Sequence, residues 1–286
     1  MNLVDGVEDY LGGEGYAGNF GLQWNTFQLT QFDSRTGKTL TRDRLLQNTK
    51  WTDLRGKRVL EVGSGAGRFT EVFLDLGADL TTFDMSSAIF ANRRNNPNGG
   101  RFARASLYDM PFEPASFDRV FCYGVLQHTP DADEAFRKLW AMVKPGGRIS
   151  IDVYAKLIVP RSYTLPKYFW RPITTRMKPE TLLKVIRWYV PKWLPVDTLI
   201  KRVPKLGPYL GGLTFIPCWN YFYLKLPKDQ AREWAIMDTF DALGAKYDQP
   251  RTRKGVLRLL EGCDEVAEHA CFAGSNGWVL SARKAE

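Results

Sequence analysis

Three glycines, Gly63, Gly65 and Gly67, alternate with small residues directly after the run Arg58–Val62. A short run rich in apolar and β-branched residues predicts a buried strand. Glycines after such a strand let the backbone turn tightly, and they let a ligand approach where a Cβ would clash. This stretch is therefore a candidate ligand-binding turn, and Arg68–Leu76 can continue from it as a helix.

An acidic residue ends the next predicted strand, Leu80–Asp84. Asp84 follows the glycines by about 20 residues, and at that point of a doubly wound sheet a carboxylate meets the hydroxyls of a bound ribose. An ionised carboxylate accepts both hydroxyl hydrogens better than a neutral side chain does. We expect Asp84 to bind a ribose; the alternative is an Asp that caps a loop.

The elements that must position these residues continue along the chain. A helix is predicted over Asp131–Met142, and the period of the apolar residues predicts strands on both sides of it. The further predicted strands are Arg101–Ala105, Ser116–Tyr123 and Ile149–Tyr154. Near the end of the chain, Thr252–Glu261 predicts a short helix, and Glu265–Phe272 with Trp278–Arg283 predicts a hairpin.

Three motifs follow one another over about 100 residues: E-x-G-x-G-x-G at 61–67, F-D-x-V with V-L-x-H at 117–128, and K-P-G-G at 144–147. The first overlaps the dinucleotide fingerprint of dehydrogenases and is weak evidence by itself. A dehydrogenase has no reason to carry the other two. Together they resemble the class I S-adenosylmethionine (SAM)-dependent methyltransferases, of the type 11 or type 25 kind, over Arg58–Tyr154 and more loosely over Thr252–Arg283.

The resemblance implies an α/β fold with a Rossmann-like seven-stranded sheet and helices on both faces. It implies that a mainly helical cap is inserted after the fifth strand. The implied parts are an N-terminal cap segment (1–51), a SAM-binding core (52–154), a basic, aromatic-rich cap insertion (155–250) and the final helix and hairpin of the core (251–286).

The resemblance also implies roles in binding SAM. Glu61 and the glycine turn would hold the methionine end, and Asp84 the ribose. Ser106 stands where the family usually has an Asp that bonds the adenine amino group, and a hydroxyl can still accept that bond. The cofactor residues implied in this way are Glu61, Gly63, Ser64, Gly65, Gly67, Asp84, Met85, Ser106, Leu107, Tyr123, Gly124 and His128.

His128 is one of only two histidines, and the resemblance places it near the acceptor. An imidazole with an unperturbed pKa of about 6.5 suits general-base work at neutral pH. We expect His128 to take a proton from an acceptor hydroxyl. The alternative is a histidine that packs or hydrogen-bonds beside the cofactor without moving protons.

Segments on either side of the core supply candidate contacts to the acceptor. In many class I methyltransferases the segment before the first motif folds over the cofactor, and an insertion after the fifth strand lies near the ligand end of the sheet. The alternative for the aromatic candidates is simple packing on the core. The candidate substrate-binding residues are Trp24, Arg42, Trp219, Tyr221 and Asp241.

The insertion 155–250 carries the basic character of the chain. Residues 155–228 hold 14 Lys and Arg against two acidic residues, whereas the whole chain has a net charge of +9. Short helices, separated by prolines, are predicted over Pro179–Val190 and Val196–Val203. Three interpretations stay open: a solvated shell over an aromatic mini-core, a site for an anionic substrate or a membrane surface, and a nucleic-acid surface without a recognisable RNA-binding module.

The composition also bears on membrane insertion, secretion and metal binding. No apolar run reaches the roughly 18 residues that span a bilayer, and Met1–Tyr10 has no apolar core of a signal peptide. The four cysteines lack metal-ligand spacing, so we expect free thiols, no metal site and a cytoplasmic protein.

The predicted function is transfer of a methyl group from SAM to a small-molecule acceptor in a biosynthetic reaction. An oxygen of a sugar or natural product is favoured, and N- or C-methylation stays open. One alternative is an RNA methyltransferase or RNA-binding protein that uses the basic insertion. The other is a non-catalytic SAM-binding partner subunit. The oligomeric state is left open.

Overall fold

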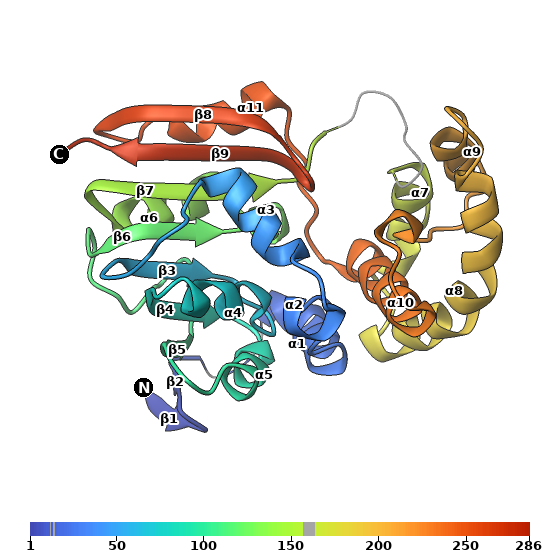
Figure 1. Cartoon of the computed structure of the whole chain (residues 1–286), viewed down its shortest axis with the longest axis horizontal. Helices are drawn as coiled ribbons and strands as arrows, with labels where there is room; N and C mark the ends of the chain where they lie inside the picture. The colour runs from blue at the N-terminus through green and yellow to red at the C-terminus, as the bar shows by residue number, and fades with distance from the viewer. Residues whose placement is uncertain (12, 14, 157–163) are drawn as a thin grey trace. The chain divides into compact units, whose positions relative to one another are not determined.

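The computed structural model describes residues 1–11, 13, 15–156 and 164–286. The chain divides into two compact units (Figure 1). The first unit comprises Met1–Lys156 and Tyr247–Glu286, and the second comprises Leu157–Lys246. The beginning of the predicted insertion, residues 157–163, lies outside the described residues.

A nine-stranded sheet forms the centre of the first unit, in the order β1-β2-β5-β4-β3-β6-β7-β9-β8 (Figure 1). The strands from β2 to β7 pair in parallel, whereas β1, β9 and β8 pair antiparallel with their neighbours. The strands are β1 (Asn2–Val4), β2 (Val7–Asp9), β3 (Arg58–Val62), β4 (Asp79–Asp84), β5 (Arg101–Arg104), β6 (Phe117–Cys122), β7 (Val143–Val153), β8 (Val266–Gly274) and β9 (Gly277–Lys284).

Helices cover both faces of this sheet, because alternate side chains of the central strands feed two separate cores. On β6, Val120 and Cys122 join one apolar cluster together with α6, whereas Phe121 joins the other together with α4. This arrangement confirms the predicted Rossmann-like α/β class. The helices are α1 (Gly18–Thr26), α2 (Asp33–Thr36), α3 (Leu40–Thr49), α4 (Arg68–Asp75), α5 (Ala88–Asn95), α6 (Ala132–Met142) and α11 (Arg253–Leu257), with single 3₁₀ turns η1 (Gly15–Ala17), η2 (Leu126–His128) and η4 (Arg258–Leu260).

The prediction of seven strands was wrong, because the first residues of the chain add a hairpin to the sheet. Asp5 and Gly6, with φ of 49° and 75°, turn the chain between β1 and β2. The second strand then pairs with β5, and Val7 is fully buried beside Ile89 and Phe102. Strands of three residues are too short to show a period in the sequence.

The K-P-G-G segment lies inside a strand and does not precede one. β7 begins at Val143, six residues before the predicted start at Ile149. Its pairing with β6 shifts register between Phe117 and Arg119, so the extra residues form a bulge in a continuous strand. Gly146, with φ of 71°, supplies the left-handed backbone there.

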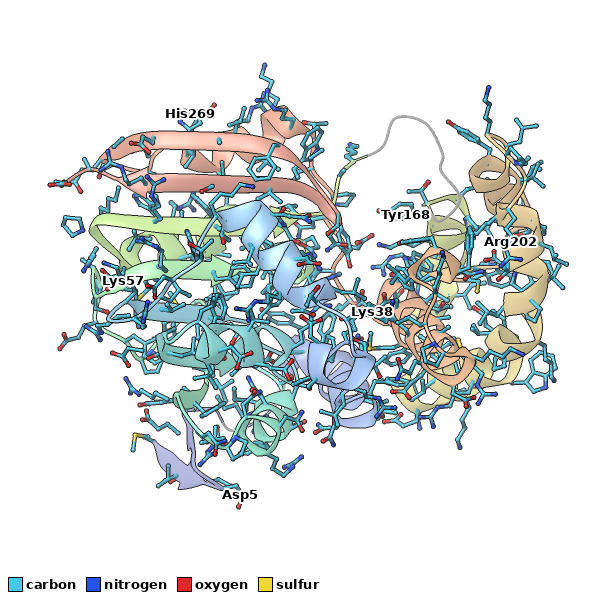
Figure 2. All side chains as sticks on the ribbon, in the orientation of Figure 1. Asp5, Lys38, Lys57, Tyr168, Arg202 and His269 are labelled. Atoms are coloured by element: carbon cyan, nitrogen blue, oxygen red, sulfur yellow. The ribbon has the colours of Figure 1, made fainter. Side chains whose placement is uncertain are left out.

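The second unit is helical, with α7 (Thr164–Thr174), α8 (Pro179–Lys201), α9 (Gly207–Leu213), η3 (Phe222–Leu224) and α10 (Lys228–Gly244). The prediction of two short helices was wrong, since α8 continues through Pro191 and Pro195. Proline removes a donor and usually ends a helix. Here burial of one face of α8 and its packing on α10 offset that loss. Figure 2 labels Tyr168 and Arg202, two exposed side chains of this unit.

The late elements confirm the predicted final helix and hairpin. Thr252 caps α11 by accepting a hydrogen bond from the Gly255 N–H, and β8 pairs with β9 through a turn at 275–276. All four cysteines are free thiols. Over the described ranges, no helix is both long enough and apolar enough to cross a bilayer.

Candidate functional site

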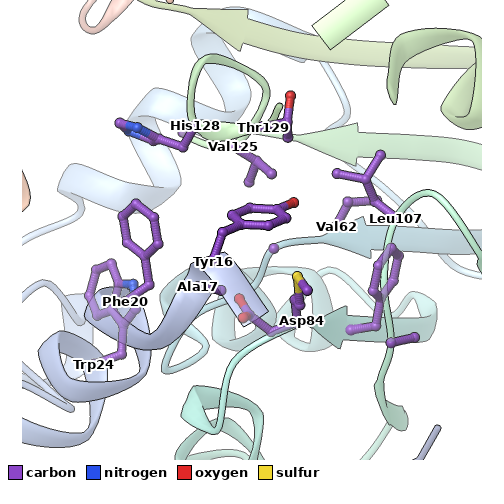
Figure 3. A pocket seen from close by; sticks show the side chains of 15 residues that line it. Tyr16, Ala17, Phe20, Trp24, Val62, Asp84, Leu107, Val125, His128 and Thr129 are labelled. Atoms are coloured by element: carbon purple, nitrogen blue, oxygen red, sulfur yellow. The ribbon is translucent and has the colours of Figure 1, made fainter. Parts of the chain in front are cut away.

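A pocket of about 580 Å³, partly open to solvent, lies in the first unit where β3, β4 and β6 end (Figure 3). In open α/β sheets ligands bind outside the carboxyl ends of the strands, which is where this pocket lies. The pocket is lined by Tyr16, Ala17, Phe20, Trp24, Val62, Gly63, Phe83, Asp84, Met85, Ala105, Leu107, Gly124, Val125, His128 and Thr129.

The glycine turn meets this pocket at Gly63, the residue of the turn that lines it. Gly63 and Gly65 both have left-handed backbone, with φ of 68° and 55°. A Cβ on Gly63 would lie 2.3 Å from Val125 Cγ2, and one on Gly65 would lie 2.9 Å from the Trp24 indole. Each position therefore requires glycine for two reasons: its positive φ and the close approach of another side chain.

Asp84 joins this turn to the end of β4. Its Oδ2 accepts the Gly65 N–H at 2.9 Å, and its Oδ1 accepts the Ser86 N–H at 2.8 Å and hydroxyl at 2.7 Å. The carboxylate also faces the pocket (Figure 3). The carboxylate therefore holds the glycine turn against the end of β4 at the edge of the pocket.

Glu61 does not line the pocket. The alternation along β3 turns its side chain toward α4, where its Oε2 accepts hydrogen bonds from the hydroxyls of Thr70 at 2.5 Å and Thr82 at 2.9 Å. Burial raises the pKa of Glu61 to about 7, although these hydrogen bonds oppose the shift. The residue is 1% exposed, so its direct role is to tie β3, β4 and α4 together beneath the glycine turn.

Gly67 closes the turn next to this buried network. Thr70 accepts a hydrogen bond from Asn92 Nδ2 at 2.8 Å, and Asn92 Oδ1 accepts one from Asn96 at 2.8 Å. Gly67 has φ of 99°, and a Cβ there would lie 2.0 Å from Asn92 Oδ1. The third glycine of the motif therefore makes room for a buried amide and does not line the pocket.

Gly124 is held in place at the end of β6 by a buried acid. Asp152 Oδ1 accepts the Gly124 N–H at 2.6 Å, and its Oδ2 pairs with Arg44 of α3. A Cβ on Gly124 would meet nothing within 4 Å, which leaves open space on the pocket side. Neighbouring Tyr123 lies outside the lining, where its hydroxyl bonds the Ser150 hydroxyl at 2.8 Å.

His128 lies in η2 at the pocket, where it is 5% exposed. Its Nδ1 is 2.9 Å from the backbone carbonyl oxygen of Tyr247. A carbonyl only accepts, so Nδ1 carries the hydrogen and Nε2 of the neutral ring is unprotonated. The rings of Phe20 and Tyr154 pack against the imidazole at centroid distances of 5.1 and 5.3 Å.

Of the other residues expected to bind the cofactor, some line the pocket and others do not. Met85 and Leu107 line the pocket. Ser106 does not, and its hydroxyl accepts the Tyr108 N–H at 3.2 Å. Ser64 is 9% exposed, and its buried hydroxyl has no hydrogen-bond partner in the described structure. Ser64 does not line the pocket.

The substrate candidates do not come together in the pocket. Trp24 is part of its lining, whereas Arg42 lies 3.7 Å from Asp75 at the surface of α3. The other three, Trp219, Tyr221 and Asp241, belong to the second unit. There the backbone N–H of Trp219 donates a hydrogen bond to the Thr239 hydroxyl at 3.1 Å. The Tyr221 hydroxyl donates to Asp238, and Asp241 lies on α10.

Several lining residues had no signal in the sequence. Tyr16 and Ala17 form a single 3₁₀ turn, and Figure 3 shows the Tyr16 ring extending across the middle of the pocket. Burial raises the pKa of Tyr16 above its usual range, and the charge of Asp84 raises it further. Val125 is the first residue of the V-L-x-H motif and Thr129 directly follows the motif, so the motif gave the only hint of their place at the pocket.

The site has the features of a nucleoside-binding α/β protein. It offers a carboxylate for ribose hydroxyls, a glycine turn for close backbone approach and apolar side chains for the faces of a base. The open space beside Gly124, which lines the pocket, also leaves room for a bound group.

Comparisons with known proteins identify the family to which this chain belongs. A family model described as "Methyltransferase domain" matches residues 60–151. The ubiquinone biosynthesis O-methyltransferase of Paraburkholderia phymatum is 36% identical over 191 residues, which cover 63% of this chain and 79% of that protein. The chain therefore belongs to the class I SAM-dependent methyltransferases, and SAM is its cofactor.

Other similarities are less extensive. The ubiquinone biosynthesis O-methyltransferase of Pseudomonas savastanoi pv. phaseolicola is 34% identical over 108 residues, which cover 35% of this chain. This chain spans about half of that relative's length, at 47%. A crystal structure of a putative SAM-dependent methyltransferase from Methanococcus maripaludis, 11% identical, has a TM-score of 0.50 over 98% of both chains and supports the fold alone.

Proposed function

We propose that the protein transfers the methyl group of SAM to an oxygen of a small-molecule acceptor. The observation that carries the proposal is the tautomer of His128, whose Nδ1 donates to the Tyr247 carbonyl. Nε2 is then free to take a proton from an acceptor hydroxyl. The names of relatives such as the Paraburkholderia phymatum O-methyltransferase support the same acceptor atom.

Bound SAM would supply an already activated methyl group, so the protein mainly contributes alignment and exclusion of water. Asp84 would accept hydrogen bonds from the ribose, and Met85 and Leu107 would contact the adenine. The Ser64 hydroxyl and the glycine turn would bind the methionine end. Glu61 would support that turn through Thr70 and Thr82 without touching the ligand.

The proposed acceptor is a hydroxylated product of biosynthesis, such as a sugar or natural product. Phe20 and Trp24 of α1 line the pocket with His128, and we propose that they contact the acceptor. Trp219, Tyr221 and Asp241 stay as proposed acceptor contacts of the second unit.

The test replaces His128 with Asn. The Asn amide can still donate toward the Tyr247 carbonyl, but nothing remains at the place of Nε2. We expect kcat for transfer of tritiated methyl groups to a pool of phenols, catechols and sugars to fall about 10²- to 10⁴-fold. We expect the Kd of SAM by calorimetry to change little.

Each other result has a definite meaning. Full activity in the His128→Asn enzyme would refute the base assignment. Label that enters RNA, offered as a separate acceptor, and none of the small molecules would favour an RNA methyltransferase. Binding of SAM without transfer to any pool would favour a non-catalytic partner subunit.

A further inference from the structure

The second unit exposes many more large apolar side chains than the first. Of the 19 such side chains that are well exposed among the described residues, 15 belong to this unit. Single exposed apolar residues are normal, but a concentration of them marks an interaction surface. A solvated charged shell over an aromatic core does not account for it.

The most regular part of this surface is one side of α8. Its members recur at intervals of three and four residues, which places them in one line along the helix. Trp188 and Leu199 are 68% and 67% exposed. A different side of α8 is buried on α10, so this line is not the core-facing one. The α8 stripe consists of Val185, Trp188, Lys192, Val196 and Leu199.

Basic side chains accompany the α8 stripe. Lys192 Nζ lies 4.2 Å from the centroid of the Trp188 ring, and Lys184 is exposed on the same helix, one turn before Trp188. The whole unit, Leu157–Lys246, has 15 Lys and Arg against 6 Asp and Glu. The surface therefore combines an apolar line with positive charge.

This combination selects one kind of partner. A bilayer that contains anionic lipids offers phosphates to Lys and Arg and an apolar boundary to Trp, Leu and Val. RNA complements the charge but offers no aliphatic region for Leu199 and Val196. We propose that the α8 stripe docks the protein on an anionic lipid surface, with the helix in the plane of the interface. This inference is independent of the proposed methyl acceptor.

The test uses the full-length protein and sedimentation with vesicles. Vesicles of phosphatidylcholine alone are compared with vesicles that also contain phosphatidylglycerol. We expect binding to the anionic vesicles that weakens as salt is added, because exposed charges are screened. Failure to bind the anionic vesicles, or equal binding to both kinds without any effect of salt, would overturn the proposal.

Matched variants locate the surface. Trp188→Ser with Leu199→Ser should lower the vesicle partition coefficient about tenfold or more, given the apolar area that is lost. Leu3→Ser is the control, because Leu3 is 71% exposed in the first unit. Equal losses in the stripe variant and the control would contradict the docking site. Since these side chains are exposed, the melting temperature should stay unchanged.

Charge variants separate the lipid surface from other partners. Lys184→Glu with Lys192→Glu should reduce binding by about tenfold or more. Lys138→Glu with Lys254→Glu makes the same change in net charge on the first unit and should have little effect. RNA capture without vesicle binding would overturn the proposal. A dimer that Leu199→Ser dissociates, again without vesicle binding, would overturn it as well.

Discussion

Replacing Glu61 with Gln tests the buried network beneath the glycine turn. Glu61 is 1% exposed and accepts hydrogen bonds from the hydroxyls of Thr70 and Thr82. Burial raises its pKa from 4.5 to about 7. Gln has the same shape and can still accept these hydrogen bonds, but it does not titrate. The substitution therefore removes the proton equilibrium and keeps the packing.

The sign of the effect follows from proton binding. Between pH 4.5 and 7 the folded protein keeps the proton on Glu61, whereas the unfolded chain releases it. The wild-type free energy of unfolding must therefore fall as pH rises through this window. A shift of this size corresponds to about 3 kcal/mol. Relative to the wild type, the Glu61→Gln variant should gain about that much between pH 4.5 and pH 8.

The assay is urea unfolding, followed by tryptophan fluorescence at several pH values from 4.5 to 8. The quantity to compare is the difference between the free energies of unfolding of variant and wild type. Glu134→Gln, at an exposed position of α6, is the control and should give a difference that hardly changes with pH. A constant difference for Glu61→Gln, or one that favours the wild type as pH rises, would refute the reasoning.

Three further substitutions probe the site. Asp84→Asn should weaken SAM binding at least about tenfold by calorimetry, because a neutral amide accepts hydroxyl hydrogens less well than a carboxylate; an unchanged Kd would count against the ribose contact. Gly67→Ala should lower the free energy of unfolding by about 2 kcal/mol or more, since its Cβ would lie 2.0 Å from Asn92 Oδ1; wild-type stability would argue against that crowding. Arg44→Met should cost about 3 kcal/mol in urea unfolding, because Asp152 is buried and loses its cation; a loss no larger than that of a surface pair would contradict it.

Two of these substitutions have close controls. Gly56 also has positive φ, at 69°, but a Cβ there would meet nothing within 4 Å. Gly56→Ala therefore reports the backbone cost alone. Arg42 lies on the same helix as Arg44, and its ion pair with Asp75 is exposed, so Arg42→Met should cost less than about 1 kcal/mol.

The order of strands and helices in the core was predictable because its signals are local. The run Arg58–Val62, the glycines after it and the acid at the end of Leu80–Asp84 define a strand, a turn and a second strand within 27 residues. Parallel strands connected by helices bring their carboxyl ends to one edge. The positions of Gly63, Asp84 and His128 at one pocket follow from that topology.

Other features depend on contacts between distant segments. The direction of the Glu61 side chain depends on which face of β3 meets α4, and the roles of Gly67 and Gly124 depend on Asn92 and Asp152. No local period marks β1 and β2, because three-residue strands are stabilised only by the sheet that they join.

By itself, the sequence determined the glycine turn, the acid at the end of the second core strand and the family, since each is written in neighbouring residues. Only the tertiary structure decided that Tyr16 extends into the pocket, that His128 is held by the Tyr247 carbonyl and that α8 continues through two prolines. The physical reason is that burial and hydrogen bonding between distant segments can outweigh local propensity.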